Sequence, residues 1–111
     1  MSRQKFILLQ PNIIMAILVD ISVIPVQSKT ASASKYVKKA LEIIKRSNLK
    51  FYAAPSMTTI EINDFSELAN LLKELYSEIL GSEVRRMETI LKIDMRNDKE
   101  NTIENRLAAI R

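Results

Sequence analysis

The stretch Ala54-Pro-Ser-Met-Thr-Thr-Ile-Glu61 decides the fold, because it joins two segments that both have the composition of short strands. β-branched residues fill it from Thr58 to Ile62, and a second strand-like segment, Leu49-Lys-Phe-Tyr-Ala53, comes just before it. Pro55 has no N–H to give to a ladder, so it suits the end of a strand. Pro55-Ser-Met57 is therefore predicted to be the bend of a β-hairpin.

The chain ahead of this hairpin predicts one long strand and one amphipathic helix. Between Ile13 and Val26, apolar residues alternate and share one face of a strand: Ile17, Val19, Ile21 and Val23. Pro25 is expected to end that strand. From Lys35 to Ser47, apolar residues recur at helical spacing: Val37, Ala40, Leu41 and Ile44. Ser32 or Ser34 is expected to cap this helix.

The chain after the hairpin repeats the pattern in reverse order. Asp64-Phe-Ser-Glu67 resembles a capping box, and the helix that follows carries a stripe of Leu68, Leu71, Leu72, Leu75 and Ile79. Gly81 is the only glycine in the chain and is predicted to stop this helix with a left-handed backbone. The span from Glu83 to Met95 alternates as the last strand, and Asn101-Thr-Ile-Glu104 predicts the start of a short final helix.

The predicted order is strand–helix–strand–strand–helix–strand with a terminal helix. Right-handed crossovers place both long helices on one face of a four-stranded antiparallel sheet. This is the ferredoxin-like α+β sandwich. Residues 15–111 are expected to form this domain, because Pro11 and Asn12 interrupt the pattern and mark residues 1–14 as an N-terminal extension.

The composition excludes several kinds of chemistry. The 111 residues contain no cysteine and no histidine, which removes thiolate nucleophiles, the commonest general base and the commonest metal ligands. We therefore expect no enzyme, no metal site and no cofactor. The net charge of +4 is mild and indicates a solvated surface rather than a nucleic-acid partner. The apolar run from Ile13 to Val19 is too short to span a bilayer, so we expect a cytoplasmic protein.

Two sets of residues are candidates for function. With both long helices on one face, the other face of the sheet is expected to be open and to expose Leu18, Ile24 and Ile90, which favours association into a homo-oligomer. In the hairpin, Ser56, Thr58, Thr59 and Glu61 form the densest polar set within an apolar context, although ordinary edge-strand residues would also give this pattern.

Ordered segments across the chain resemble one known family. These are Ile21-Ser-Val-Ile-Pro25, Ser34-Lys-Tyr-Val37, Pro55-Ser-Met-Thr-Thr-Ile-Glu61, Ile90-Leu-Lys-Ile-Asp94 with Arg96, Asp98 and Lys99, and Thr102-Ile-Glu104. From about Met15 to the C-terminus, the chain resembles the thiamine-binding protein family, which is similar to YkoF-like proteins.

The resemblance implies a ferredoxin-like fold, homo-oligomers that are dimers or tetramers, and binding of thiamine or its hydroxymethylpyrimidine part without catalysis. It carries the ligand-binding role to Ser22, Ser34, Thr58, Thr59 and Glu61, to which the hairpin adds Ser56. Glu61 is expected to accept hydrogen bonds from the aminopyrimidine. The alternatives are a structural or regulatory homo-oligomer without a thiamine ligand and, third, an RNA-binding module.

Overall fold

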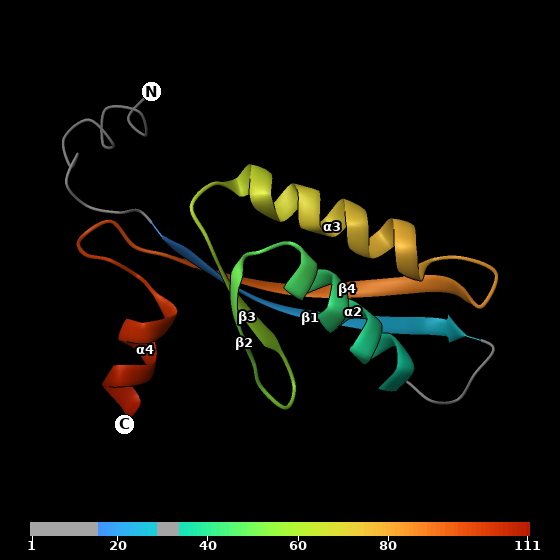
Figure 1. Cartoon of the computed structure of the whole chain (residues 1–111), viewed down its shortest axis with the longest axis horizontal. Coiled ribbons are helices and arrows are strands. Elements are labelled where there is room, and N and C mark those ends of the chain that lie inside the picture. Colours follow the sequence, from blue (N-terminus) through green and yellow to red (C-terminus); the bar gives the residue numbers. More distant parts are fainter. Residues whose placement is uncertain (1–15, 29–33) are drawn as a thin grey trace.

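The computed structural model describes residues 16–28 and 34–111. The elements are β1 (Ile17–Ser28), α2 (Ser34–Arg46), β2 (Lys50–Ala53), β3 (Thr58–Ile62), α3 (Phe65–Ile79), β4 (Val84–Met95) and α4 (Ile103–Ile110). The sheet has the order β2-β3-β1-β4, and every neighbouring pair is antiparallel. The predicted ferredoxin-like α+β fold is confirmed (Figure 1). The predicted extension, residues 1–14, and the expected cap Ser32 lie outside the described residues.

The core lies between the sheet and the two long helices. Ile17, Val19 and Ile21 of β1 point into it, as their alternation predicts, and Ile60 and Ile62 of β3 lie beside them. The helices add Ala40, Ile43 and Ile44 from α2 and Leu68, Leu71, Leu75 and Ile79 from α3. At roughly 1.5–3 kcal/mol for each large apolar side chain removed from water, this layer supplies the main drive to fold.

The apolar stripe of α2 is rotated relative to the prediction. Tyr36 and Ile43 are buried, whereas Val37 is 57% exposed and Leu41 is half-buried. The helix is apolar over a wider arc than the core needs, so sequence spacing alone could not decide which edge of that arc faces inward.

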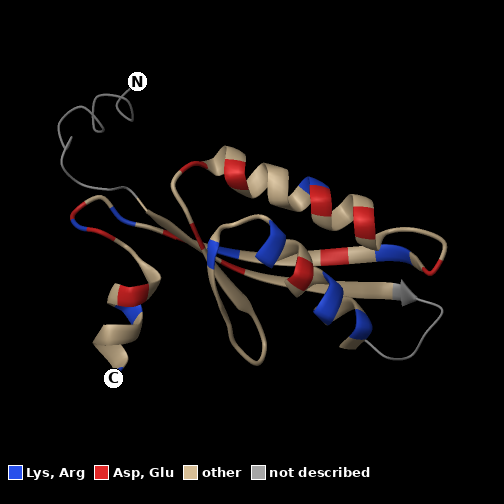
Figure 2. Ribbon diagram, viewed as in Figure 1, with Lys and Arg blue, Asp and Glu red and all other residues tan. Residues whose placement is uncertain are grey.

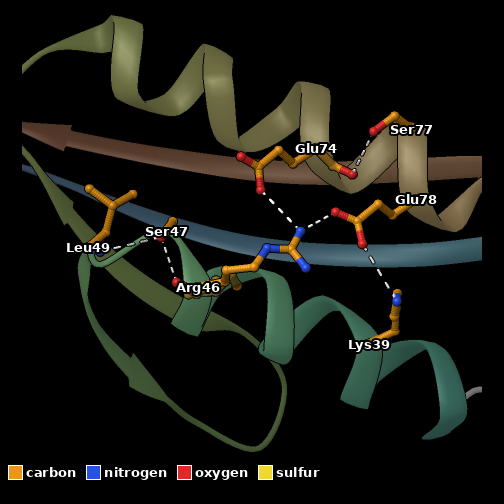
Figure 3. Close-up of polar contacts among 8 residues, drawn as sticks. Lys39, Arg46, Ser47, Leu49, Glu74, Ser77 and Glu78 are labelled. Atoms are coloured by element: carbon orange, nitrogen blue, oxygen red, sulfur yellow. Dashed lines mark hydrogen bonds and ion pairs between the residues drawn. The ribbon is translucent and has the colours of Figure 1, made fainter.

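The two long helices are also joined by charge. The charged residues of α2 are mostly Lys and Arg, and those of α3 are mostly Glu (Figure 2). Arg46 contacts Glu74 at 3.2 Å and also bonds Glu78, whose second carboxylate oxygen lies 3.6 Å from Lys39 (Figure 3). The Arg46 guanidinium lowers the pKa of Glu78. Because cations of α2 meet carboxylates of α3, they do not form a purely basic face.

The ends of the helices follow the predictions in part. Asp64 caps α3 by accepting from Ser66 N at 2.9 Å, while Glu67 reaches back to accept from Asp64 N at 3.1 Å, which is the predicted capping box. The predicted left-handed stop at Gly81 is wrong. The chain leaves α3 through Leu80 in an extended conformation, φ −68° and ψ 134°, and no glycine has positive φ. Among the described residues, a left-handed backbone occurs instead at Asn48, φ 64°, just after α2.

The first strand, β1, extends beyond its predicted end, whereas β4 ends at Met95 as predicted. β1 does not stop at Pro25 but continues beside β4 to Ser28, with breaks in register between Pro25 and Gln27 and again at Ser28. A proline cannot donate to the ladder, so the strand bulges at this point instead of ending.

The other face of the sheet is not fully open, which corrects the expectation. The final helix, α4, begins after its cap Thr102 and lies apart from α2 and α3 (Figure 1). It covers the end of this face where Leu18 lies, and Leu18 is buried. Ile24 and Ile90 lie further along the same face and remain exposed.

Candidate ligand-binding site

The sheet divides the predicted ligand residues between its two faces. Thr58 pairs with Ile21 and therefore faces the helices, whereas Thr59 pairs with Asp20 and faces α4. Glu61 is on the α4 face as well, opposite Leu18. Neighbours in sequence thus end up in different environments, because successive side chains of a strand point in opposite directions.

A cavity of about 250 Å³ lies between α2 and the β2–β3 hairpin. Ser56 and Thr58, two of the predicted ligand residues, are part of its lining. Ser22 also borders it, but Ser22 pairs with Ile90 and its side chain is on the opposite face, so it contributes its main chain. The rest of the lining is apolar and comes from the core edge, from α2 and from the bend: Ile21, Val23, Val37, Ala40, Leu41, Ile44, Ala53, Ala54, Pro55 and Met57. The described residues that line this cavity carry no charge.

The strand pairing creates this cavity. β3 stops pairing with β1 at Thr58 opposite Ile21, whereas β1 continues beside β4. The hairpin closes in a tight turn in which Ala54 N donates to Met57 O at 3.0 Å. Beyond Ile21, the main chain of β1 therefore has no β3 partner among the described residues. Main-chain groups and hydroxyls together can form hydrogen bonds with the donors and acceptors of a small heterocycle.

Ser34, another predicted ligand residue, lies elsewhere. It is the first residue of α2 and lines a larger groove of about 780 Å³ that runs toward the loop between α3 and β4. Both positive and negative side chains line this groove, and Lys35 pairs there with Glu83 at 2.9 Å. The structure therefore does not bring Ser34 together with Thr58.

Glu61 has a partner within the chain. Its Oε1 accepts a hydrogen bond from the main-chain N–H of Ile103, the first residue of α4, at 2.9 Å. Thr102 supplies the other cap by accepting from Asn105 N at 3.1 Å. Free N–H groups at the start of a helix favour a carboxylate. Glu61 thus fixes α4 to the sheet.

Further polar contacts hold α4 to the same face. Arg106 pairs with Asp94 at 2.7 Å, and Lys50 pairs with Glu104 at 3.3 Å. A main-chain N–H of Glu104 itself, and then Lys50, lower the pKa of that carboxyl. Beside α4, Thr59 donates its hydroxyl proton to Asp20 at 2.5 Å.

Sequence analysis missed the apolar half of the cavity lining and the role of Glu61. Val37 is exposed and Leu41 is half-buried because both line the cavity. The apolar arc of α2, which is wider than the core needs, is the sequence signal that could have indicated this cavity. The contact between Glu61 and Ile103 has no local signal, because 42 positions separate the two residues.

The described part of the chain offers neither a metal-binding cluster nor a membrane-spanning helix. Across residues 16–28 and 34–111, no group of three or more Asp and Glu side chains is placed to hold a metal ion. The helices within these ranges are each too short or too polar to cross a membrane.

The fold and the cavity define a ferredoxin-like α+β domain with room for a small molecule. The chain belongs to the thiamine-binding protein family, whose model matches residues 19–111. It is 45% identical over 94 residues to the UPF0045 protein MJ1052 of Methanocaldococcus jannaschii, a match that covers 85% of this chain and 91% of that protein.

Solved structures agree with this family. The crystal structure of the same M. jannaschii protein superposes with a TM-score of 0.75 at 44% identity, over 86% of this chain and 95% of that one. A Thermotoga maritima protein, provisionally assigned to thiamine biosynthesis or salvage, gives a TM-score of 0.73 at 27% identity, over 86% and 99% of the two chains.

Proposed function

We propose that this protein binds thiamine through its hydroxymethylpyrimidine part in the cavity between α2 and the β2–β3 hairpin. The observation that carries the proposal is the presence of the Ser56 and Thr58 hydroxyls, beside the main chain of Ser22, in the lining of a small apolar cavity. Family membership supports a thiamine-related ligand. The Thermotoga relative points to the same area of metabolism.

The chemistry of the cavity favours the pyrimidine over the rest of thiamine. Its apolar walls can hold a flat ring, and hydroxyls can both donate to and accept from the ring nitrogens and the amino group. The thiazolium part is a cation, and burying it without a carboxylate partner is costly. We therefore place the pyrimidine inside the cavity and the thiazolium at its mouth. The hydroxyls take over the hydrogen bonding first expected of Glu61, which is engaged by α4.

We also propose that binding proceeds without catalysis and in the cytoplasm. The sequence carries no histidine or cysteine that could act as base or nucleophile at this cavity. The hydroxyls of Ser and Thr need an adjacent base to become nucleophiles. The described lining residues include no such base.

Titration calorimetry with hydroxymethylpyrimidine and with thiamine tests the assignment. Thr58→Val removes one hydroxyl and keeps the shape, and the lost hydrogen bond of about 0.5–1.5 kcal/mol should weaken binding roughly two- to tenfold. Thr59→Val makes the same change one residue along, on the opposite face, and should leave the affinity unchanged. Hydroxymethylpyrimidine should retain most of the affinity of thiamine.

Either of two results would contradict this proposal. Absence of heat from the wild type with both ligands at millimolar concentration would remove the thiamine assignment. A loss of affinity that follows Thr59→Val instead of Thr58→Val would place the ligand on the α4 face of the sheet.

A second candidate function is a homo-oligomer formed through the open part of the sheet. Ile90 is 54% exposed and Ile24 is 37% exposed, and they lie on neighbouring strands of the same face. Large apolar side chains grouped on an uncovered sheet face favour contact with a second copy of the chain. Leu18, the third residue of the expected interface, is covered by α4 within the chain, so the proposed contact is smaller than the sequence predicts.

A further inference from the structure

The strand β4 forms one edge of the sheet. Its 12 residues pair with β1 on one side, and among the described residues no strand pairs with its other side. The strand at the opposite edge, β2, has 4 residues. No proline interrupts β4. A long edge strand presents a row of main-chain N–H and C=O groups with which a further strand can pair.

The charges of β4 on the open face of the sheet have a particular order. Arg86 and Glu88 precede Ile90 on this face, and Lys92 and Asp94 follow it. At equal distances from Ile90, a cation on one side therefore has an anion on the other side. Charges on an edge strand usually prevent pairing. This order instead makes β4 complementary to a second β4 that runs in the opposite direction.

The charges favour one register for such a pair. With a two-fold axis at Ile90, Glu88 faces the partner's Lys92. Arg86 then faces the partner's Asp94, and symmetry repeats both pairs. An axis one residue nearer the N-terminus would set Arg86 against Lys92. An axis one residue nearer the C-terminus would set Glu88 against Asp94. Opposite charges across two strands stabilise a sheet and like charges destabilise it, so the axis at Ile90 is preferred.

The charges next to the axis are available for this contact. Lys92 lies opposite Asp20 of β1, but it is exposed and makes no ion pair in the described part of the chain. Glu88 is exposed and has a 3.6 Å contact to its own strand. The carboxylate of Asp94 already pairs with α4 at 2.7 Å, and its main-chain O accepts from Asn101 at 2.9 Å. The two pairs of Glu88 with Lys92 therefore carry most of the complementarity.

The helix side of the same edge also has an exposed apolar residue. Ile93 lies opposite the buried Val19 and thus on the helix face, yet it is 48% exposed. The axis at Ile90 sets Ile93 against the partner's Met87, which gives it an apolar neighbour.

We propose that two copies of this chain pair edge to edge through β4, antiparallel and with the two-fold axis at Ile90, so that their sheets join into one. This contact is separate from the proposed contact through the open face of the sheet and depends on no ligand.

Two charge-reversal variants test the pairing, because each should repel itself and attract the other. Glu88→Lys and Lys92→Glu each set like charges against one another at both symmetric positions. Each should raise the dissociation constant of the wild-type contact about tenfold or more in sedimentation velocity. An equimolar mixture of the two variants restores opposite charges and should associate as the wild type does. Glu42→Lys makes the same change of charge at an exposed position of α2 and should leave association unchanged.

Hydrogen exchange in the wild type tests the geometry directly. As the protein concentration is raised and the chains associate, every second amide between Glu88 and Lys92 should become protected, because the outward N–H groups enter a ladder. A contact between open faces would leave these main-chain groups unpaired. Ile24→Asp disturbs the open face and leaves β4 intact, so this protection should persist in it.

Failure of the edge pairing and failure of the open-face contact can be distinguished. Wild-type association of Glu88→Lys alone, no recovery in the mixture, or no concentration-dependent protection in β4 would each overturn the edge pairing. Equal sedimentation of Ile24→Asp and the wild type would instead remove the open-face contact and leave the edge pairing in place.

Discussion

At the scale of single residues, Gly81 and Asn48 differ in backbone conformation, because Asn48 is left-handed and Gly81 is not. Gly81 has no positive φ, and a Cβ built on it meets no atom within 4 Å. Gly81→Ala should therefore stabilise the fold by about 0.4–1 kcal/mol, because it restricts the unfolded chain. Asn48→Ala should destabilise it by about 1 kcal/mol, since a Cβ without a polar end resists the left-handed conformation at φ 64°. Urea unfolding of both variants measures the difference, and a destabilised Gly81→Ala would contradict the observed end of α3.

The surroundings of single side chains at the site were the hardest feature to predict from the sequence. The hairpin indicated a polar cluster, but adjacent Thr58 and Thr59 belong to opposite faces, and only the register with β1 decides which face each takes. That register depends on where the strands end. A shift of one residue would exchange the two side chains, so the residue types could be predicted more safely than their surroundings.

At the scale of elements, α4 depends on one carboxylate from another part of the chain. Glu61→Ala leaves the Ile103 N–H without its acceptor and should destabilise the helix by about 1–3 kcal/mol. Glu61→Gln keeps an acceptor oxygen and should cost only the interaction with the helix dipole, about 0.3–1 kcal/mol. Hydrogen exchange at the amides of α4 measures both changes.

A matched control uses the exposed pair at the same helix. Glu104→Gln breaks the contact with Lys50, but both side chains are largely exposed, so α4 should keep its protection. Fast exchange in Glu104→Gln together with slow exchange in Glu61→Ala would show that Lys50, and not Glu61, holds the helix.

The elements themselves could largely be predicted from the sequence. The capping box at Asp64 and the alternation of β1 are local signals, and both long helices lie close to their predicted ends. The position of α4 could not be predicted, because its contacts to Leu18, Glu61 and Asp94 all come from distant strands. A short helix with exposed Ile110 has no strong pattern of its own to say which surface it covers.

At the scale of the whole molecule, the topology follows from few rules. The chain has an antiparallel hairpin, β2–β3, in the middle of its sequence and a right-handed crossover on either side of it. Together these lead to one arrangement of four strands, which is the order found. The same rules leave one sheet face without a long helix. The chain covers the Leu18 end of that face with α4 and leaves Ile24 and Ile90 exposed further along.

This uncovered part of the sheet leads to the prediction about assembly. Sedimentation velocity at micromolar concentration should show the wild type as a dimer or tetramer. Ile90→Asp would put an unpaired charge into the contact, at a cost of roughly 3 kcal/mol or more, and should raise the dissociation constant about a hundredfold.

Leu80→Asp is the control, because Leu80 is 37% exposed but lies in the loop that follows α3, away from this face. Its assembly should equal that of the wild type. A monomeric wild type would exclude the oligomer, whereas equal dissociation by both variants would place the contact elsewhere on the molecule.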